Sequence, residues 1–198
     1  EMCIRDRFKY IANAAKISKK DKVLEIGCGW GSFSQYVAIK YGCRVKGITL
    51  SKNQVTYVND LFKYSKIKDL ASVELLDYRD LNGKFDKIIS IEMFEAVGEE
   101  YWPTFAAALQ RLLSPGGRIF LQTIIIRDDL FSNYRKNVDF IQKYIFPGGI
   151  LPSNQILQTL FPQPRWTWHK LALSNVNYAN TLAHWRVNFE AAWPQIKY

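Results

Sequence analysis

A glycine-rich turn between a strand-like run and a helix-like run constrains this chain most. Residues 22–26 are apolar enough for a buried parallel strand, and residues 32–41 are typical of a helix. Gly27, Gly29 and Gly31 lie between them. Glycines at such a junction allow a sharp turn and let a ligand approach the backbone. The turn therefore predicts a βαβ sheet with a ligand site beside its first strand.

Strand-like and helix-like runs continue to alternate, which is typical of an α/β fold with a mostly parallel sheet flanked by helices. Further strands are expected at 44–48, 73–76, 85–91 and 118–123, with 165–173 as a candidate sixth, and helices at 32–41, 51–64, 101–113, 128–144, 153–160 and 178–193. We expect a single domain over residues 8–198. Residues 1–7 fit no element, and we expect them to be non-native or disordered. No strand follows the last helix, so the sheet should lack a closing edge strand.

The composition indicates which kinds of partner and which cellular compartment suit the chain. Its net charge of +9 favours an anionic partner, either nucleic acid or an anionic membrane surface. No apolar run approaches the roughly 18 residues of a membrane span, so a membrane contact would be at the surface. Cys3, Cys28 and Cys43 form no C-x-x-C pair, and their odd number argues against disulfides and structural zinc. We expect a cytoplasmic protein with no metal site.

The spacing of the glycines separates two classes of ligand. A dinucleotide-binding fingerprint needs its third glycine at position 32, where this chain has Ser32 after Gly31. Glu25, just before the turn, can anchor it by accepting backbone hydrogen bonds. The E-x-G-x-G-x-G form resembles the first motif of the class I S-adenosylmethionine methyltransferases. That resemblance implies a Rossmann-like fold with cofactor contacts from Gly27, Gly29 and Gly31.

Further cofactor contacts are expected where the next two strands end, at the same edge of the sheet. The second strand ends at Thr49 and Leu50, with Gln54 soon after, and it lacks the acid that usually binds the ribose. The third strand ends before Asp77, which can accept from an adenine amino group, and Tyr78, which can cover the ring. A simple polar turn would explain this last pair equally well.

Four segments narrow the resemblance to one family. They are GITLS at 47–51 with Gln54, SIEMFEAVG at 90–98, YIFPGG at 144–149 with LPS at 151–153, and FEAAWP at 189–194. In order and spacing they resemble the cyclopropane fatty acyl phospholipid synthases and their mycolic acid relatives, from about Phe8 to the last residue. The family transfers a one-carbon unit from S-adenosylmethionine to the cis double bond of an acyl chain.

The resemblance also implies an active site. Thr49 and Gln54 match positions that contact the cofactor in place of the usual acid. Glu95 matches the active-site glutamate that helps to hold a bicarbonate ion, while Ile124 and Tyr178 match residues that complete the ion site. Glu92, three residues earlier, is expected to be structural.

Methylation of an alkene favours a pocket lined by aromatic side chains, called the aromatic wall below. Methyl transfer leaves a carbocation on the acyl chain, which aromatic faces can stabilise and a dry pocket can protect. About half of the candidates should reach the site, since aromatic side chains more often belong to the core. The candidates are Phe94, Tyr101, Tyr144, Phe146, Tyr178 and Trp185.

One difference from the family leaves two possible reaction products. Well-known members have a histidine where this chain has Gln122, and glutamine can donate to bicarbonate but cannot shuttle a proton. Either the ion site works with glutamine, or the reaction stops at a methyl- or methylene-branched chain. The family's N-terminal lipid-binding region and its bicarbonate cysteine would lie upstream of this chain. A third hypothesis is a non-catalytic cofactor-binding module at a membrane surface.

The expected partner is unsaturated phospholipid in an anionic membrane, with the protein at the inner face of the cell membrane. Nucleic acid is not expected, because the aromatic-rich final third lacks clustered Lys and Arg and has no asparagine-proline-proline-aromatic motif. Pairing into a homodimer is open.

Overall fold

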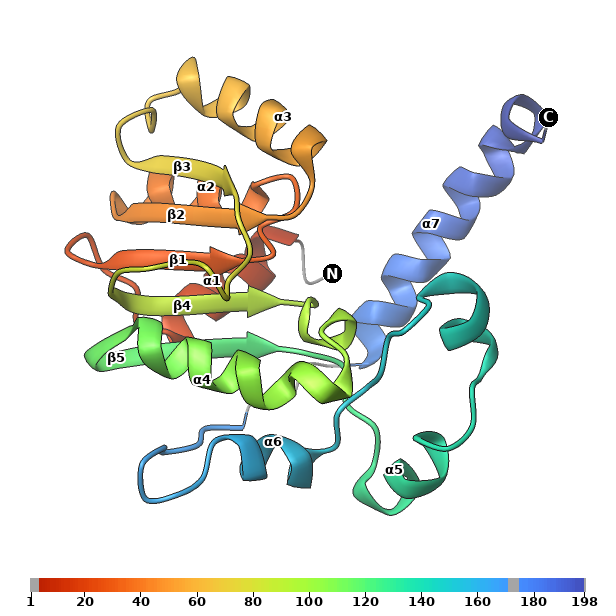
Figure 1. Cartoon of the computed structure of the whole chain (residues 1–198). Coiled ribbons are helices and arrows are strands. Elements are labelled where there is room, and N and C mark those ends of the chain that lie inside the picture. Colours follow the sequence, from red (N-terminus) through yellow and green to blue (C-terminus); the bar gives the residue numbers. More distant parts are fainter. Residues whose placement is uncertain (1–3, 171–174, 198) are drawn as a thin grey trace.

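Five parallel strands form the centre of the molecule in the order β3-β2-β1-β4-β5 (Figure 1). The computed structural model describes residues 4–170 and 175–197. The strands are β1 (Lys22–Ile26), β2 (Arg44–Thr49), β3 (Ala71–Leu75), β4 (Phe85–Ile91) and β5 (Leu113–Gln122). The helices are α1 (Ile4–Ala14), α2 (Ser32–Tyr41), α3 (Lys52–Lys63), α4 (Trp102–Leu112), α5 (Asp128–Tyr134), α6 (Asn154–Leu160) and α7 (Asn175–Ile196). Among the described residues no strand closes the sheet beyond β5, as the sequence predicts.

The central strands β1 and β4 are buried on both faces. Adjacent side chains of a strand point to opposite sides of the sheet, and helices pack on each side. Val23 and Ile89 join a core with α1, α2 and α3, whereas Leu24 and Ile88 join a second core with α4 and α6. This arrangement is the reason why these strands are continuous apolar runs rather than alternating ones. Helices therefore cover both faces of the sheet (Figure 1).

The strand order reverses between β1 and β4, the position at which open α/β sheets form a crevice for ligands. The chain moves outward from β1 to β2 and β3, then returns to pair β4 with the other side of β1. Loops leaving β1 and β4 at their carboxyl ends consequently diverge, which is where open α/β sheets bind ligands. The 3-10 turns Phe94–Ala96 and Glu99–Tyr101 follow β4 at this edge.

Two helices, α3 and α6, begin at serine N-caps. The Ser51 hydroxyl accepts from the backbone N–H of Gln54, and the Ser153 hydroxyl accepts from that of Ile156, both at 3.4 Å. Each bond satisfies one of the free N–H groups at a helix start.

The N-terminal prediction is wrong for residues 4–7, which the structure places in α1. Phe8 and Ile11 are buried from this helix, and the ring of Phe8 meets that of Phe33 edge-to-face at 5.5 Å. The helix packs on α2, so its first turn belongs to the fold.

The long helix predicted over 128–144 is also wrong, because α5 ends at Tyr134 and a π-helical turn spans Ile141–Ile145. Between these two segments, asparagine and aspartate side chains form hydrogen bonds with backbone groups and so compete with the hydrogen bonds of a helix. Asn137 donates to the carbonyl of Asn133 at 2.8 Å, and the Asp139 carboxylate accepts from the N–H of Gln142 at 2.8 Å.

The candidate sixth strand has no counterpart in residues 165–170, and residues 171–173 lie outside the described part of the chain. The backbone of residues 165–170 does not join the sheet, and two tryptophan side chains of this segment pack against Phe161. The rings of Trp166 and Trp168 meet Phe161 edge-to-face, and the Trp168 indole donates to the carbonyl of Phe161 at 2.7 Å. The last helix, α7, begins earlier than predicted and extends away from the sheet (Figure 1).

Candidate functional site

The glycine-rich turn folds back tightly over the end of β1. Gly27, Gly29 and Gly31 have φ values of 75°, 54° and 77°, a region that side chains disfavour. The N–H groups of Gly27 and Cys28 both donate to the carbonyl of Ile48 in β2, at 3.0 and 3.1 Å. The loop is thereby fixed to two strands at the carboxyl edge, as the sequence predicts.

The three glycines face different surroundings. A Cβ at Gly27 would lie 2.7 Å from Met93 Cγ, and one at Gly31 would lie 2.5 Å from Val58 Cγ1. A Cβ at Gly29 would meet nothing within 4 Å. Gly27 and Gly31 therefore allow the loop to pack against the loop after β4 and against α3, whereas the space beside Gly29 is open.

Glu25 lies beneath this loop and is almost fully buried. Its carboxyl accepts a hydrogen bond from the hydroxyl of Ser34, in the first turn of α2, rather than from the loop that the sequence suggested. Burial raises the pKa of Glu25 to about 8, although its bonds with Ser34 oppose the shift. Burial therefore favours the neutral form of this carboxyl.

The end of β2 supplies Thr49, Leu50 and Gln54. The Thr49 hydroxyl donates to the Gln54 side-chain oxygen at 2.6 Å, which leaves the Gln54 amide N–H groups to face outward. Leu50 is 73% exposed beside them. These residues present donors and an apolar surface without an acid.

Asp77 and Tyr78 follow β3 as predicted, but Asp77 has a local partner. Its carboxylate accepts from Arg79 Nε at 2.9 Å and from Arg79 Nη2 at 2.7 Å. The Arg79 side chain holds the pKa of Asp77 below its usual value. Tyr78 is half-buried and meets Phe105 edge-to-face at 5.2 Å. The polar-turn interpretation describes Asp77 itself, and a role toward adenine stays a prediction.

Glu95 is held where β4 and β5 end. One carboxylate oxygen, Oε1, accepts from the backbone N–H of Ile124 at 2.6 Å, and the carbonyl of Glu95 accepts from the N–H of Ile150 at 2.9 Å. The other oxygen, Oε2, is buried with no hydrogen-bond partner among the described residues. A buried, unpaired carboxylate oxygen is costly, so this atom calls for an explanation. Met93, two residues earlier, lines Gly27 of the glycine-rich turn.

Gln122 turns toward Glu92 rather than Glu95. Its amide nitrogen donates to Glu92 Oε1 at 2.7 Å, and the same carboxylate oxygen accepts from Arg7 Nη1 at 3.1 Å. The side-chain oxygen of Gln122 is buried with no partner among the described residues. Arg7, Glu92 and Gln122 thus form a cluster at the carboxyl end of β4 and β5.

The structure does not bring the described members of the predicted aromatic wall together. Phe94 is fully buried and stacks with Trp102 at 5.5 Å, which makes it part of the core beneath the site. Tyr101 lies within cation–π distance of Arg79, at 5.6 Å. Tyr144, Phe146 and Trp185 are each more than 60% exposed, while the side chain of Tyr178 lies outside the described residues.

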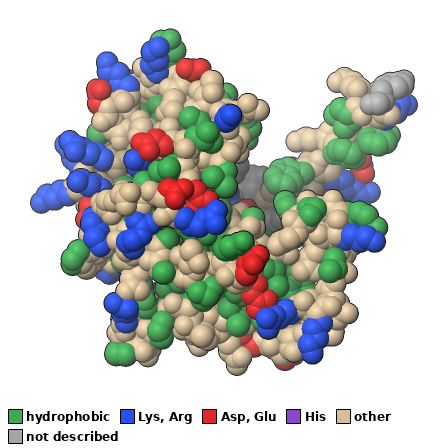
Figure 2. All heavy atoms as spheres, in the orientation of Figure 1, with side chains coloured by type: hydrophobic (Ala, Val, Ile, Leu, Met, Phe, Trp, Pro, Cys, Tyr) green, Lys and Arg blue, Asp and Glu red, His purple; other side chains and the backbone are tan. Residues whose placement is uncertain are grey.

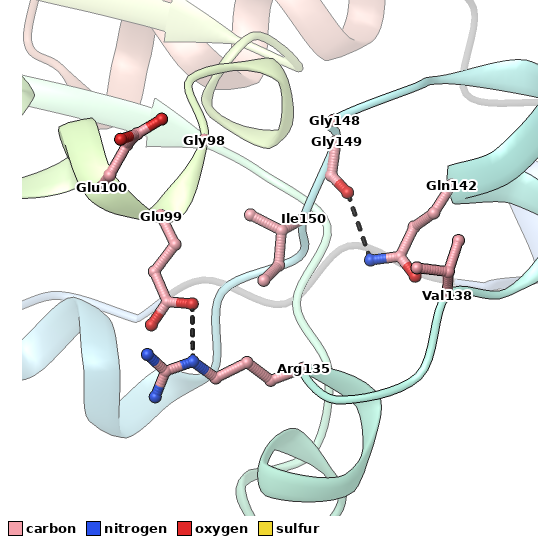
Figure 3. Close-up of a pocket in the computed structure, with 9 residues that line it drawn as sticks. All are labelled: Gly98, Glu99, Glu100, Arg135, Val138, Gln142, Gly148, Gly149 and Ile150. Carbon is pink, nitrogen blue, oxygen red and sulfur yellow. Dashed lines mark hydrogen bonds and ion pairs between the residues drawn. The ribbon is translucent and has the colours of Figure 1, made fainter.

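A cavity of about 490 Å³ lies between the loop after β4 and the segment that connects α5 to α6 (Figure 3). Glu99 and Arg135 face each other across it at 2.7 Å, and the Gln142 amide donates to the carbonyl of Gly149 at 3.3 Å. Ile150 lies between these pairs and also bonds the backbone of Glu95. The cavity therefore shares a wall with the loop that carries Glu95.

The sequence prediction missed Arg7 and Met93 and left Glu92 without a function. Glu92 has φ of 51°, which is uncommon for a residue with a side chain, but no local pattern announces it. Arg7 is 85 residues from Glu92, so only the folded chain brings them together.

We expect the stability of the chain to fall as the pH rises through the range in which Glu25 ionises. The unfolded carboxyl ionises near pH 4.3, whereas burial raises the folded pKa of Glu25 to about 8. Between these values the unfolded state has fewer protons, so its ionisation favours unfolding. Glu25→Gln should remove this dependence, measured as Tm at pH 5 and pH 8. Exposed Glu100→Gln should retain it, and equal slopes for both variants would contradict the assignment.

Comparison with known proteins gives one consistent result. The family described as mycolic acid cyclopropane synthetase matches residues 3–198. Over 194 residues the chain is 38% identical to a cyclopropane-fatty-acyl-phospholipid synthase of Escherichia coli K12, which covers 96% of this chain and 47% of that protein. It is 35% identical to a tuberculostearic acid methyltransferase of Mycobacterium tuberculosis, over 93% of this chain and 43% of that protein. The chain thus spans less than half the length of these relatives.

Solved structures agree with the fold. A mycolic acid cyclopropane synthase complexed with SAH (S-adenosylhomocysteine) and CTAB superposes with a TM-score of 0.83 at 27% identity, over 96% of this chain and 70% of that one. The architecture is that of the Rossmann-like class I methyltransferases, with an unclosed sheet. On the match over nearly its whole length, the chain belongs to the mycolic acid cyclopropane synthetase family.

Proposed function

We propose that this chain is the catalytic core of an S-adenosylmethionine-dependent methyltransferase that converts the cis double bond of a phospholipid acyl chain into a cyclopropane. The observation that carries the proposal is the geometry of Glu95. One oxygen is anchored to the backbone of Ile124, and the other is buried without a partner among the described residues, on a loop whose Met93 lies against Gly27 of the glycine-rich turn. A fixed base next to a donor-binding loop is what this reaction needs.

The residues around the crevice fit the methyl donor. Gly29 leaves open backbone for it, Gln54 offers free amide N–H groups, and Tyr78 offers a ring edge near the end of β3. When bound there, the cofactor supplies an electrophilic sulfonium methyl group. The protein's part is to hold the alkene in line with that group at contact distance, which supplies much of the rate enhancement.

The second step requires a base. Addition of the methyl group leaves a carbocation on the acyl chain, and loss of a proton from the added carbon lets the ring close. Glu95 Oε2 receives that proton, while the Ile124 N–H keeps the carboxylate in place.

A bicarbonate ion beside Glu95 stays a prediction. Of the buried polar atoms without a partner in this region, Glu95 Oε2 and Gln122 Oε1 are acceptors, whereas Arg7 Nε is a donor. The side chain of Tyr178, which the family resemblance adds to the ion site, lies outside the described residues. We assign no step to bicarbonate.

A lipid surface agrees with the outer face of the molecule. Six large apolar side chains of the segment after α5 are at least half exposed: Val138, Phe140, Ile141, Tyr144, Ile145 and Phe146. Arg135, Lys136 and Lys143 stand among them. Figure 2 also shows hydrophobic side chains along α7. Such a mixture suits the inner face of an anionic membrane. In the described residues, no helix has the length and apolar character of a membrane span.

The test uses S-adenosylmethionine with a labelled methyl group and vesicles of unsaturated, anionic phospholipid. Label in the lipid together with the upfield proton NMR signals of a cyclopropane supports the proposal. Binding of the cofactor with no transfer to lipid would contradict it and favour a non-catalytic module.

Gln122 favours one second candidate, methylation without ring closure. Glutamine cannot relay a proton, so a branched product would follow if the new carbon is not deprotonated in line with ring closure. A ring and a methylene branch have equal mass, and proton NMR separates them by the vinylidene signals of the branch.

A further inference from the structure

We propose that a groove at the amino ends of β1, β2 and β3 is a second binding site, which takes a soluble anion with two or three linked phosphate groups. The groove has a volume of about 370 Å³, within the range of small-molecule sites. It lies at the opposite edge of the sheet from the glycine-rich turn and Glu95, so the proposal does not rest on the proposed function.

One face of the sheet is left open over β2 and β3. On the side where α4 packs, residues 76–84 connect β3 to β4, and these described residues form no helix (Figure 1). Ser72 and Glu74 are exposed on this side, whereas Ala71 and Val73 point to the other side and are buried with α3. The open face is therefore polar.

Cationic side chains gather on this face. Lys22 and Arg44 are direct partners in the parallel register of β1 and β2, so their side chains point to the same side, and Lys46 follows two residues after Arg44. Lys68, from the loop before β3, lines the same groove. Figure 2 shows Lys and Arg side chains along the left of the molecule, where Figure 1 places the amino ends of these strands.

This arrangement opposes folding unless an anion is present. Like charges directly opposite each other on neighbouring strands are destabilising. No described residue forms an ion pair with the side chains of Lys22, Arg44 or Lys68. Lys46 alone has a partner, Glu74, at 2.8 Å. Three neighbouring cations thus lack a counter-charge in the described part of the chain.

The acids near the groove do not balance these cations. Asp69 lines the rim, and Glu74 is used by the ion pair just described. Asp86 accepts from the backbone N–H of Lys22 at 2.8 Å, which fixes the start of β1 rather than the ammonium group. Four cations therefore face three carboxylates, two of which are already bonded. Phosphate oxygens would accept charge-assisted hydrogen bonds from Lys22 and Arg44 and offset their repulsion.

The positions of the cations favour linked phosphates over a single one. Neighbouring strands lie about 4.8 Å apart, and two residues along a strand span about 6.5 Å, so Lys22, Arg44 and Lys46 can each reach a different phosphate. The position of the groove favours a soluble ligand over a lipid. The exposed apolar residues 138–146 lie near Ile150 and Glu95 at the carboxyl edge, so a bilayer that meets them leaves the amino edge to solvent.

Inorganic tripolyphosphate is the probe for this site. It is titrated by calorimetry into the free chain and into its SAH complex, at about 0.15 M salt, where the Debye length is about 8 Å and weak long-range attraction is screened. We expect saturable binding of one tripolyphosphate per chain, at least about tenfold tighter than inorganic phosphate, since more cations are engaged. SAH should leave this affinity unchanged, because the two ligands occupy opposite edges of the sheet.

A double variant, Lys22→Gln with Arg44→Gln, should weaken tripolyphosphate binding by at least about tenfold, because two charge-assisted hydrogen bonds are lost. Its Tm without ligand should not fall, since the cross-strand repulsion is removed as well. The matched control is Lys9→Gln with Lys40→Gln, which removes the same charge from exposed positions on α1 and α2. The control should bind tripolyphosphate as wild type does.

The remaining outcomes are distinguishable. No saturable binding by wild type, or an equal loss in both double variants, overturns the site. Competition between tripolyphosphate and SAH overturns it too, because the anion would then lie in the cofactor region. Wild-type binding to vesicles of anionic phospholipid that Lys22→Gln with Arg44→Gln abolishes, without tripolyphosphate binding, would assign the groove to lipid head groups instead. A chain that binds tripolyphosphate as expected, yet transfers no methyl group, retains this site and loses the proposed function.

Discussion

Glu95→Gln should lower the rate of product formation by about 10²–10⁴-fold, the usual contribution of a positioned base. The substitution preserves shape and leaves a side-chain oxygen for the Ile124 N–H, which now binds Glu95 Oε1 at 2.6 Å. It removes the proton acceptor at Oε2. Both ring closure and formation of a methylene branch require loss of a proton, so both products should decline. SAH affinity, measured by calorimetry, should stay within a few-fold of wild type.

Glu99→Gln is the matched control for this experiment. Glu99 is a nearby glutamate on the same loop, and its carboxylate pairs with Arg135 across the cavity rather than facing the crevice. Its loss should change the rate far less. If Glu95→Gln retained full activity, another group would have to take the proton and the mechanism proposed for Glu95 would be wrong.

The sheet was predictable because its signals are local. Each strand buried on both faces is a short apolar run, and the turn glycines mark where β1 ends. The predicted strands therefore agree with β1, β2, β3, β4 and β5 to within a few residues at most ends. The strand order, and with it the crevice, follows from the connections that parallel strands allow.

The errors have two physical causes. Phe8, Ile11, Ala12 and Ala15 are all buried in one core, at the i, i+3, i+4, i+7 spacing of a helix face, so the sequence did contain a signal for α1 from Phe8 onward. The break after α5 depends on side-chain hydrogen bonds of Asn137 and Asp139, which overrule an apolar pattern that continues through them.

Much of the site could not be predicted from single residues. The residue types of Glu95 and Gln122 are visible in the sequence, but their partners depend on tertiary contacts. Arg7 comes from the first helix and Glu92 from the end of β4, and only the packed sheet shows that Gln122 faces them rather than Glu95.

Gly29→Ala and Gly31→Ala should separate ligand binding from folding in the glycine-rich turn. At Gly31 an alanine Cβ would lie 2.5 Å from Val58 Cγ1 at φ of 77°, so strain and overpacking add. We expect the free energy of unfolding to fall by about 2–5 kcal/mol. At Gly29 the Cβ meets no protein atom within 4 Å, so only the strain of φ 54° remains, about 1–2 kcal/mol. Urea denaturation measures both values.

For SAH binding we expect the larger loss at Gly29, although the larger loss of stability is expected at Gly31. The Cβ of Gly29→Ala enters the open space that we assign to the cofactor, so affinity should fall by at least about tenfold, or ~1.4 kcal/mol. Gly116→Ala is its matched control, because Gly116 has φ of 72°, also faces nothing within 4 Å, and lies in the first half of β5. Both variants carry similar backbone strain, and only one adds a methyl group beside the ligand. Equal SAH affinity for the two would mean that the cofactor does not approach Gly29, because the strain they share cannot account for a loss specific to this loop.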